Sequence, residues 1–415
     1  MVKMSKLECR FCGASLDYTF VDLGTSPLAN SYVPYDRVLE MEPFYALHAY
    51  VCRDCFLVQL PMMATRETIF NAEYAYFSSY SESVLAHSRA YVAQMIDRFG
   101  FDNRHQVVEI ASNDGYLLKY FRERGVNVLG VEPSANVAEV AVAAGIPTRV
   151  RFFGVETATA LKAEGFRPDL MLGNNVLAHV PDINDFVAGF KILLGPHGVI
   201  TIEFPHLLQK LENVYYDQIY HEHYSYLSFW SVEKIFAHHG LTLFDVDEIP
   251  PQGGSLRIYA CHTGDATRPV GPRVTEMRER EIAAGITSLP RYRAFAEQVY
   301  RTKRDLLRFL GDAREAGKTV AGYGALAKGN TLLNFCGIRT DFLDYTVDIS
   351  PHKYGRLLPG TRIPVHPPEK LFETRPDYVL ILAWNIKDEI MRNMAGVRDW
   401  GGRFVVPLPE VAVLD

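Results

Sequence analysis

The sequence predicts an α/β protein in which a small N-terminal zinc-binding domain precedes two Rossmann-like domains. Three observations predict this fold class. Two Cys-x-x-Cys pairs lie near the N-terminus, a strand, small-residue turn and helix follow one another over residues 107–124, and a second such unit covers 319–331. The expected domains are 1–75 for zinc, 76–265 for the central domain, 266–315 for a helical linker and 316–415 for the C-terminal domain.

The length and composition exclude several classes of function. At about 150 residues per domain, 415 residues correspond to roughly two to four domains. The chain has 43 Lys and Arg against 49 Asp and Glu, a net charge of −6, so it lacks the basic field that supplies non-specific affinity for nucleic acid. No apolar run approaches the ~18 to 20 residues of a membrane span, and the first residues have no secretory pattern. We expect a cytoplasmic protein with neither nucleic acid nor membrane as partner.

The two cysteine pairs, Cys9-x-x-Cys12 and Cys52-x-x-Cys55, have the spacing of a four-thiolate zinc site. Each pair presents two thiolates from one tight turn, and two such turns complete a tetrahedron around the metal. With four thiolates bound, the zinc has no open position for substrate or water, so we expect a structural role. A redox-active pair and chance spacing are the alternatives.

Residues 107–115, Val-Val-Glu-Ile-Ala-Ser-Asn-Asp-Gly, predict an apolar strand that runs into a turn of small and polar residues. A helix from about Tyr116 to Arg124 follows, so backbone N–H groups of the turn can approach a nucleotide-like ligand. The next strand ends in Glu132, and an acid at this place typically accepts hydrogen bonds from ribose hydroxyls. The turn lacks the GxGxxG pattern, which favours a ligand without phosphates.

Two further strand-to-loop units, beginning at Asp169 and Gly198, continue this alternation. The first runs through Asn174 and Asn175 into the loop 176–182, Val-Leu-Ala-His-Val-Pro-Asp. Alternating strands and helices predict a mostly parallel sheet covered by helices, with ligands at the carboxyl ends of the strands.

The segment 217–228, Asp-Gln-Ile-Tyr-His-Glu-His-Tyr-Ser-Tyr-Leu-Ser, concentrates reactive side chains. It offers a phenol, two imidazoles and a carboxylate within four residues: Tyr220, His221, Glu222 and His223. Metal binding, proton transfer and a plain loop are the alternatives, and the histidines lack the i, i+4 spacing of the helical zinc motif. General-base chemistry fits better, because a histidine with a near-neutral pKa can remove a proton beside an orienting carboxylate and a supporting phenol.

The second βα unit, 319–331, contains a glycine turn and a helix start with one lysine, Lys328. Backbone N–H groups of such a turn can hold an anion, and the lysine can neutralise it. The following strand ends at Asp348, and Lys353 and Arg356 add positive charge nearby. The pattern favours a nucleotide or phosphate site, with a degenerate Rossmann-like domain that only packs as the alternative.

The central motifs resemble the class I S-adenosylmethionine-dependent methyltransferases: E-x-A-x-N-D-G at 109–115, the acid at Glu132, and N-x-x-x-H-V-P-D at 175–182. With the cysteine pairs, the Tyr220–His223 cluster and the Gly322–Lys328 motif in this order, the whole chain resembles the three-domain, zinc-containing sugar C-methyltransferases. That family methylates carbon 3 of nucleotide-linked 4-ketosugars in deoxysugar biosynthesis for antibiotics or polysaccharides.

The resemblance implies S-adenosylmethionine in a central class I methyltransferase domain, a structural zinc in the N-terminal domain, and the sugar nucleotide against the C-terminal domain. The implied zinc ligands are Cys9, Cys12, Cys52 and Cys55. The implied catalytic residues are Tyr76, His179, Tyr220, Glu222 and His223. The expected donor-binding residues are Glu109, Ala111, Asn113, Gly115, Tyr116, Leu117, Glu132, Pro133, Asn174 and Asn175.

The expected substrate is a nucleotide-diphosphate 4-ketosugar, with thymidine diphosphate as the nucleotide. The residues expected to bind that nucleotide are Tyr323, Gly324, Ala325, Lys328, Asn330, Thr331, Asp348, Lys353 and Arg356. We expect the chain to be a monomer or a weak homo-oligomer.

In the resulting hypothesis, His223 removes the C-3 proton and Glu222 orients or supports its imidazole. Tyr220 and His179 hydrogen-bond the polar groups around the C-4 oxyanion. His221 occupies the unspecified position of the Y-x-E-H element and is expected to face solvent. Two alternatives remain: an O- or N-methyltransferase for a small metabolite, and a non-enzymatic nucleotide-binding protein.

Overall fold

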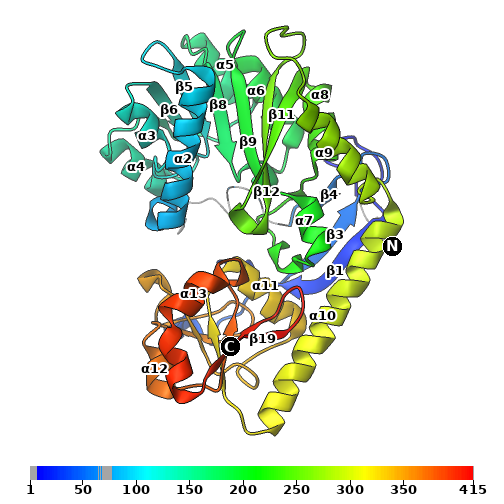
Figure 1. Cartoon of the computed structure of the whole chain (residues 1–415), viewed down its shortest axis with the longest axis vertical. Coiled ribbons are helices and arrows are strands. Elements are labelled where there is room, and N and C mark those ends of the chain that lie inside the picture. The colour runs from blue at the N-terminus through cyan, green and yellow to red at the C-terminus, as the bar shows by residue number, and fades with distance from the viewer. Residues whose placement is uncertain (1–6, 64, 66, 68–76, 415) are drawn as a thin grey trace.

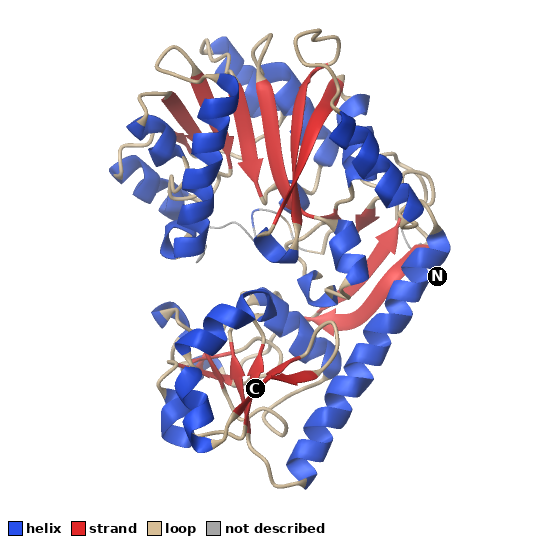
Figure 2. Ribbon diagram, in the orientation of Figure 1, coloured by secondary structure: helices blue, strands red, loops and turns tan. Residues whose placement is uncertain are grey.

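The computed structural model describes residues 7–63, 65, 67 and 77–414. Two α/β bodies, each built on its own sheet, lie one above the other, and a long helix, α10, runs along one side of the lower body (Figure 1). Helices cover the large sheets, and a smaller sheet lies between the bodies and α10 (Figure 2). Tyr76 lies outside the described residues.

The smaller sheet belongs to the zinc domain and has the strand order β1-β3-β4-β10. Its strands are β1 (Tyr18–Ser26), β3 (Tyr45–Val51), β4 (Val58–Gln59) and β10 (Ser225–Tyr226). Alternate residues of β3, among them Leu47 and Ala49, are buried, as expected for a strand with one face on the core. Strand β10 belongs to the reactive segment 217–228 and pairs antiparallel with β4, so the zinc domain holds that segment directly.

The central sheet has the order β11-β12-β9-β8-β5-β6-β7. The pairings from β9 to β7 are parallel, and β12 runs antiparallel to both β9 and β11. The strands are β5 (Gln106–Ile110), β6 (Asn127–Val131), β7 (Thr148–Arg149), β8 (Leu170–Asn174), β9 (Val199–Pro205), β11 (Leu241–Ile249) and β12 (Ser255–His262). The inner strands are nearly continuous apolar runs because helices cover both of their faces.

The helices of this body begin with α2, whose first turn is capped by the side chain of Ser81. They are α2 (Glu82–Phe99), α3 (Leu118–Glu123), α4 (Ala135–Ala143), α5 (Val155–Ala163), α6 (Ile183–Leu193), α7 (Leu207–Glu212) and α8 (Phe229–His238). The expected alternation of strands and helices is confirmed, and the carboxyl ends of β5, β6, β8 and β9 share one edge of the sheet.

The C-terminal sheet has the order β19-β18-β17-β13-β14-β16-β15-β2. Its strands are β13 (Val320–Tyr323), β14 (Thr346–Val347), β15 (Arg356–Leu357), β16 (Pro364–His366), β17 (Tyr378–Ile381), β18 (Arg403–Val406) and β19 (Ala412–Leu414), with helices α11 (Ala327–Cys336), α12 (Lys370–Thr374) and α13 (Lys387–Asn393). The edge strand β2 (Val33–Pro34) comes from the N-terminal domain and pairs antiparallel with β15. The α/β fold class with three domains is therefore confirmed.

Helices α9 (Pro272–Ala283) and α10 (Leu289–Glu315) form the connection between the two bodies. Helix α10 buries a stripe of residues at helical spacing that includes Phe295 and Val299, and its charged side chains face outward. The ring of Phe295 stacks on Phe20 of β1 with centroids 4.8 Å apart, which fixes the zinc domain to α10. Among the helices in the described ranges, none is both long and apolar enough to cross a membrane.

Candidate active site

A cavity of about 2060 Å³ lies where the three domains meet. The zinc domain contributes Asn30, the central domain contributes Asn113 and His223, and the C-terminal domain contributes Lys328. A ligand that fills this cavity therefore contacts residues that are far apart in the sequence, and the site is complete only when the domains are together.

The four cysteines fit a structural zinc. Their Sγ atoms all lie within 4.8 Å of one another, with Cys9 and Cys55 3.6 Å apart and Cys12 and Cys52 3.5 Å apart. A tetrahedron with zinc–sulfur bonds of about 2.3 Å has edges of about 3.8 Å, close to these separations. Nε2 of Gln59 donates to Cys9 Sγ at 3.1 Å, a contact that would orient the thiolate in a loaded site. The expected four-thiolate site is confirmed as a cluster that fits the metal.

The turn after β5 is backbone-strained where the sequence predicted a ligand-binding turn. Ala111 and Asn113 have φ angles of 56° and 50°, which residues with a Cβ adopt at a cost and which cluster at functional sites. Gly115 has φ 77°, and a Cβ there would lie 2.9 Å from Cγ1 of Ile146, so the position requires glycine. Asn175, after β8, also has a positive φ of 55° and faces the cavity.

Carboxyl groups gather at this edge of the sheet, and they favour a cationic ligand. Glu109 is fully buried, and burial together with the charges of Asp114, Glu132 and Glu203 raises its pKa well above the usual range. Glu132 accepts hydrogen bonds from the backbone N–H groups of Asn113 at 3.0 Å and Ser134 at 2.8 Å, so its orientation is fixed. S-adenosylmethionine carries a sulfonium and an amino group, both cationic, and the residues present fit it.

The reactive segment places His223 beside Tyr220 in a defined tautomer. Nδ1 of His223 lies 3.1 Å from the backbone oxygen of Gln218, which can only accept, so Nδ1 carries the proton. Nε2 lies 2.9 Å from the hydroxyl of Tyr220 and accepts from it. Burial, with the neighbouring His179 and the positive charges of Lys210 and Lys328 adding to it, holds the pKa of His223 well below its usual range. His223 is thus a neutral imidazole whose basic nitrogen is directed at a phenol.

Glu222 and His179 complete the group. Glu222 accepts from Nδ2 of Asn30 at 2.7 Å, and burial raises the pKa of its carboxyl to about 7. The ring of His179 meets that of His223 edge to face with centroids 4.6 Å apart, and burial lowers its pKa to about 4. The hypothesis that Glu222 orients the imidazole of His223 differs from this arrangement, because Gln218 and Tyr220 hold the ring and Glu222 faces the zinc domain.

His221 was expected to face solvent, but the structure buries it. It is 5% exposed, and its Nε2 lies 3.2 Å from the carbonyl oxygen of Ala46 in β3. Its ring also packs against Tyr45. The expectation was wrong because the neighbouring strand β10 joins the sheet of the zinc domain, and this brings His221 against β3.

The C-terminal wall of the cavity is basic. Lys328, in the first turn of α11, donates to Oδ1 of Asn385 at 3.2 Å. Lys353 donates to Asp348 at 3.1 Å and to the carbonyl of Ala325 at 2.6 Å. Together with the exposed Arg356, these lysines place positive charge beside the glycine turn, opposite the carboxyl-rich edge of the central sheet.

The structure brings most of the predicted site residues onto one cavity. Those that line it are Ala111, Asn113, Tyr116, Glu132, Pro133, Asn174, Asn175, His179, Tyr220, Glu222, His223, Tyr323, Gly324, Lys328, Asp348, Lys353 and Arg356. Asn330 and Thr331 pack instead, because their side chains donate to the carbonyl oxygens of Ala29 and Ile219. Glu109, Gly115, Leu117 and Ala325 support the walls from behind.

Three residues at the site were not predicted. Asn30 holds Glu222, Gln218 holds His223, and His87 of α2 lies 2.8 Å from the carboxylate of Glu203 at the cavity wall. Gln218 lies inside the reactive segment 217–228, so the sequence could have indicated that it belongs to the site. Asn30 and His87 belong to no motif, and only the folded chain brings them to the site.

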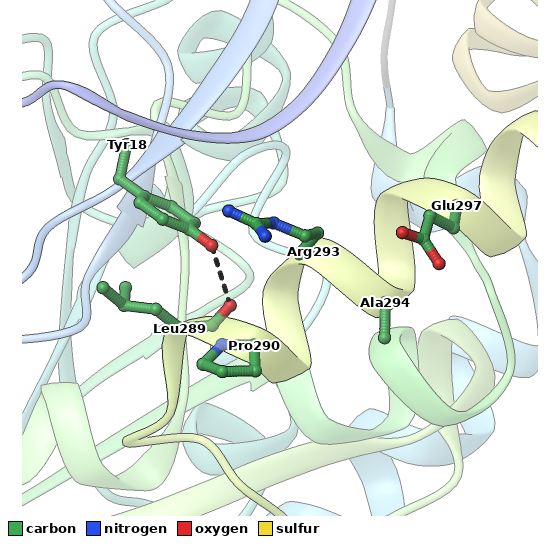
Figure 3. Close-up of a pocket in the computed structure, with 6 residues that line it drawn as sticks. All are labelled: Tyr18, Leu289, Pro290, Arg293, Ala294 and Glu297. Carbon is green, nitrogen blue, oxygen red and sulfur yellow. Dashed lines mark hydrogen bonds between the residues drawn. The ribbon is translucent and has the colours of Figure 1, made fainter.

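A second hollow, of about 410 Å³, lies between β1 and the first turns of α10 (Figure 3). The hydroxyl of Tyr18 donates to the carbonyl oxygen of Leu289 at 3.2 Å, and Arg293 and Glu297 line the same face. We interpret it as a packing groove where the helix meets the zinc domain.

Comparison with known proteins agrees with this arrangement. Residues 9–70 match a zinc binding domain model, 84–246 a methyltransferase domain model and 250–409 the model of a C-methyltransferase C-terminal domain. The C-methyltransferase NovU of Streptomyces niveus is 36% identical over 407 residues, which cover 98% of this chain and 96% of that protein.

More distant similarities are confined to part of the chain. The ubiquinone biosynthesis O-methyltransferase of Chelativorans sp. (strain BNC1) is 30% identical over 98 residues, 23% of this chain and 39% of that protein. The structure of magnesium protoporphyrin IX methyltransferase from Synechocystis PCC 6803 with bound SAM covers 48% of this chain and 89% of its own, with TM-score 0.34 and 13% identity. The full-length match and the three domain models together show that the chain belongs to the zinc-binding C-methyltransferases that use S-adenosylmethionine.

Proposed function

We propose that the protein methylates carbon 3 of a nucleotide-diphosphate 4-ketosugar in deoxysugar biosynthesis, with thymidine diphosphate as the expected nucleotide. The observation that carries the proposal is the position of the His223–Tyr220 pair in a cavity between a carboxyl-rich edge and a basic wall. The carboxyl-rich edge suits a cationic methyl donor, and the basic wall suits a diphosphate.

The pair can perform the proton abstraction that C-methylation requires. A proton next to a ketone is acidic only if the resulting enolate is stabilised. When Nε2 of His223 takes the C-3 proton, it no longer accepts from Tyr220, and the phenol can turn its O–H to the developing C-4 oxyanion. His179, packed edge-on against His223, borders the same space.

S-adenosylmethionine, when bound, supplies an electrophilic methyl group that carbon 3 accepts. The chain's own contribution is to hold the sugar between base and donor. The C-terminal wall supports this role, because Lys328, Lys353 and Arg356 can bind the remote diphosphate, and remote binding energy positions the reacting carbon. The third domain therefore has a catalytic purpose in the proposal.

The direct test is mass spectrometry of the protein incubated with S-adenosylmethionine and thymidine, guanosine and cytidine diphosphate 4-ketosugars. We expect a gain of one methyl on a sugar carbon with one nucleotide preferred. Exchange of the C-3 proton with deuterated water separates C-methylation from O- or N-methylation, which needs no carbon acid. Methyl transfer to oxygen or nitrogen without such exchange would overturn the proposal.

A further inference from the structure

A buried lysine lies beneath the reactive segment and outside the cavity. Lys210 of α7 is 2% exposed, and its Nζ lies 2.5 Å from Oε1 of Gln218. The ammonium also lies 5.4 Å from the ring centroid of Tyr226. Neither Lys210 nor Gln218 lines the cavity, so Lys210 is not placed to bind substrate or donor.

Gln218 connects this lysine to the imidazole of His223. Its backbone oxygen accepts from Nδ1 of His223 at 3.1 Å, while its side-chain amide donates to the carbonyl of Gln252 at 2.8 Å. Gln218 is thus held from two sides, by Lys210 and by the 251–253 turn. The same residue therefore carries both these side-chain contacts and the backbone oxygen that sets the tautomer of His223.

The charge near His223 is positive on balance. The nearby acid that counters Lys210 and Lys328 electrostatically is Asp217, which is completely buried and accepts from Nε1 of Trp384 at 2.6 Å. Within the described residues its second oxygen has no hydrogen bond. Asp217 is thus the carboxyl whose charge acts on both Lys210 and Lys328, while the hydrogen-bond partners of the two lysines are the neutral side chains of Gln218 and Asn385.

Titratable groups lie around the imidazole on several elements of the described chain. These groups are His179 before α6, Lys210 of α7, Asp217 at the start of the segment, Tyr220, Glu222, Tyr226 of β10 and Lys328 of α11. Glu222, the nearest carboxyl in the sequence, is directed to Asn30. Burial lowers the pKa of Lys210 to about 7 and that of Lys328 to about 8, and Asp217 opposes both shifts.

We propose that Lys210 is a positioning residue for the proton abstraction, which fixes Gln218 under His223 and opposes a second proton on that imidazole by its charge. This inference rests on the proposed function for its catalytic meaning, but the contacts that support it do not involve a ligand. A neutral His223 at the start of the reaction is what a general base requires. The hydrogen bond through Gln218 supplies orientation, and the ammonium supplies the electrostatic bias.

The two contributions can be separated by two variants. Lys210→Gln keeps an N–H donor near Gln218 and removes the charge, whereas Lys210→Met removes both. Lys191→Met is the matched control, because Nζ of Lys191 also donates to a carbonyl oxygen, that of Gly240 at 2.9 Å, but on α6 away from the cavity. Circular dichroism and thermal melting establish that each variant is folded, and Lys210→Gln keeps the test decisive if Lys210→Met does not fold.

The first readout needs no substrate. NMR titration of the protein with ¹³C-labelled histidine, with His223 assigned by comparison with His223→Asn, reports the pKa of that ring. We expect an upward shift of about half a unit or more in both Lys210 variants and none in the control. An unchanged pKa of His223 in folded Lys210→Gln would overturn the electrostatic part of the inference.

The second readout is exchange of the C-3 proton of the ketosugar in deuterated water. We expect exchange to be at least about tenfold slower in Lys210→Met and within a few-fold of wild type in Lys210→Gln above the shifted pKa. Equal exchange in Lys210→Met and wild type would overturn the positioning role. If wild type itself exchanged no proton with any ketosugar, the proposed function would fail, while the NMR shift would still decide the electrostatic inference.

Discussion

Nη1 of Arg10, the residue after the first zinc-binding cysteine, donates to the carbonyl oxygen of Pro181 at 2.8 Å. Pro181 is two residues from His179, and the side-chain amide of Asn184 returns a hydrogen bond to the carbonyl of Phe11 at 2.9 Å. The first zinc turn and the loop that carries His179 are thus clamped together. A zinc atom with no open position can therefore still affect catalysis through the loop it supports.

Loss of zinc is the first prediction. We expect one zinc per chain by elemental analysis, and Cys9→Ala should lower both zinc content and turnover, by up to about 100-fold if the His179 loop moves by about 1 Å. Cys261→Ala, at a buried cysteine of β12 outside the cluster, is the control and should keep its zinc. Full turnover by a zinc-free chain would contradict this view.

Removal of the proposed base, His223, gives the second prediction. His223→Asn should lower methylation roughly 10²- to 10⁴-fold, because an amide cannot take the C-3 proton, while donor affinity by calorimetry stays near wild type. His221→Asn is the control within the same segment, since the ring of His221 contacts Ala46 and lies apart from the His223–Tyr220 pair. A near-normal turnover of His223→Asn would rule out the assignment.

The buried carboxyl of Glu222 predicts a pH dependence of stability. Burial raises its pKa from 4.5 to about 7, so the folded state binds this proton more tightly than the unfolded state does. The protonated carboxyl therefore contributes to the free energy of unfolding in full below about pH 4.5, and this stabilisation is lost as the pH rises through 7. Glu222→Gln should therefore gain stability relative to wild type between pH 5 and 8, approaching about 3 kcal/mol. Urea unfolding at both pH values measures the difference, with Glu315→Gln at the exposed end of α10 as the control. A pH-independent difference would show that Glu222 titrates normally.

The basic wall predicts a change in affinity for the sugar nucleotide but not for the methyl donor. Lys328→Met should raise KM for the nucleotide sugar roughly 10- to 100-fold, the loss expected for a charge-assisted hydrogen bond to phosphate, and leave donor affinity unchanged. Lys370→Met is the control, because Lys370 pairs with Glu373 on α12 and does not line the cavity. An unchanged KM would place the diphosphate elsewhere.

The sequence predicted those features that depend on local spacing. Two Cys-x-x-Cys pairs form two tight turns. A single turn likewise brings Tyr220 next to His223, three residues later, and the hydrogen bond from the backbone N–H of His223 to the carbonyl oxygen of Tyr220 closes that turn. The turn after β5 was likewise predicted from its small and polar residues, but the positive φ of Ala111 was not, because alanine adopts that backbone only at a cost.

Other features depend on contacts between distant parts of the chain. The hydrogen bond from Asn30 to Glu222 joins residues 192 positions apart, and no periodicity or motif in the sequence predicts it. The same holds for His221, which lies 175 positions from its partner Ala46 and is buried because β10 adds to the sheet of the zinc domain. Packing between domains decided these positions, so the direction of a side chain within the reactive segment could not be derived from the segment itself.

The two-residue strand β2 limits how this enzyme can be divided. Val33 pairs with Leu357 at the edge of the C-terminal sheet, so residues from the first and last thirds of the chain share one hydrogen-bonded sheet. The central third lies between them in the sequence and forms a sheet of its own. A recombinant chimera designed to exchange nucleotide specificity must therefore transfer residues 28–43, which include β2, together with the C-terminal domain 316–415. An exchange of only the residues after about 316 would place β2 of one protein against β15 of another, and mismatched side chains there would leave backbone N–H and C=O groups unpaired at the sheet edge.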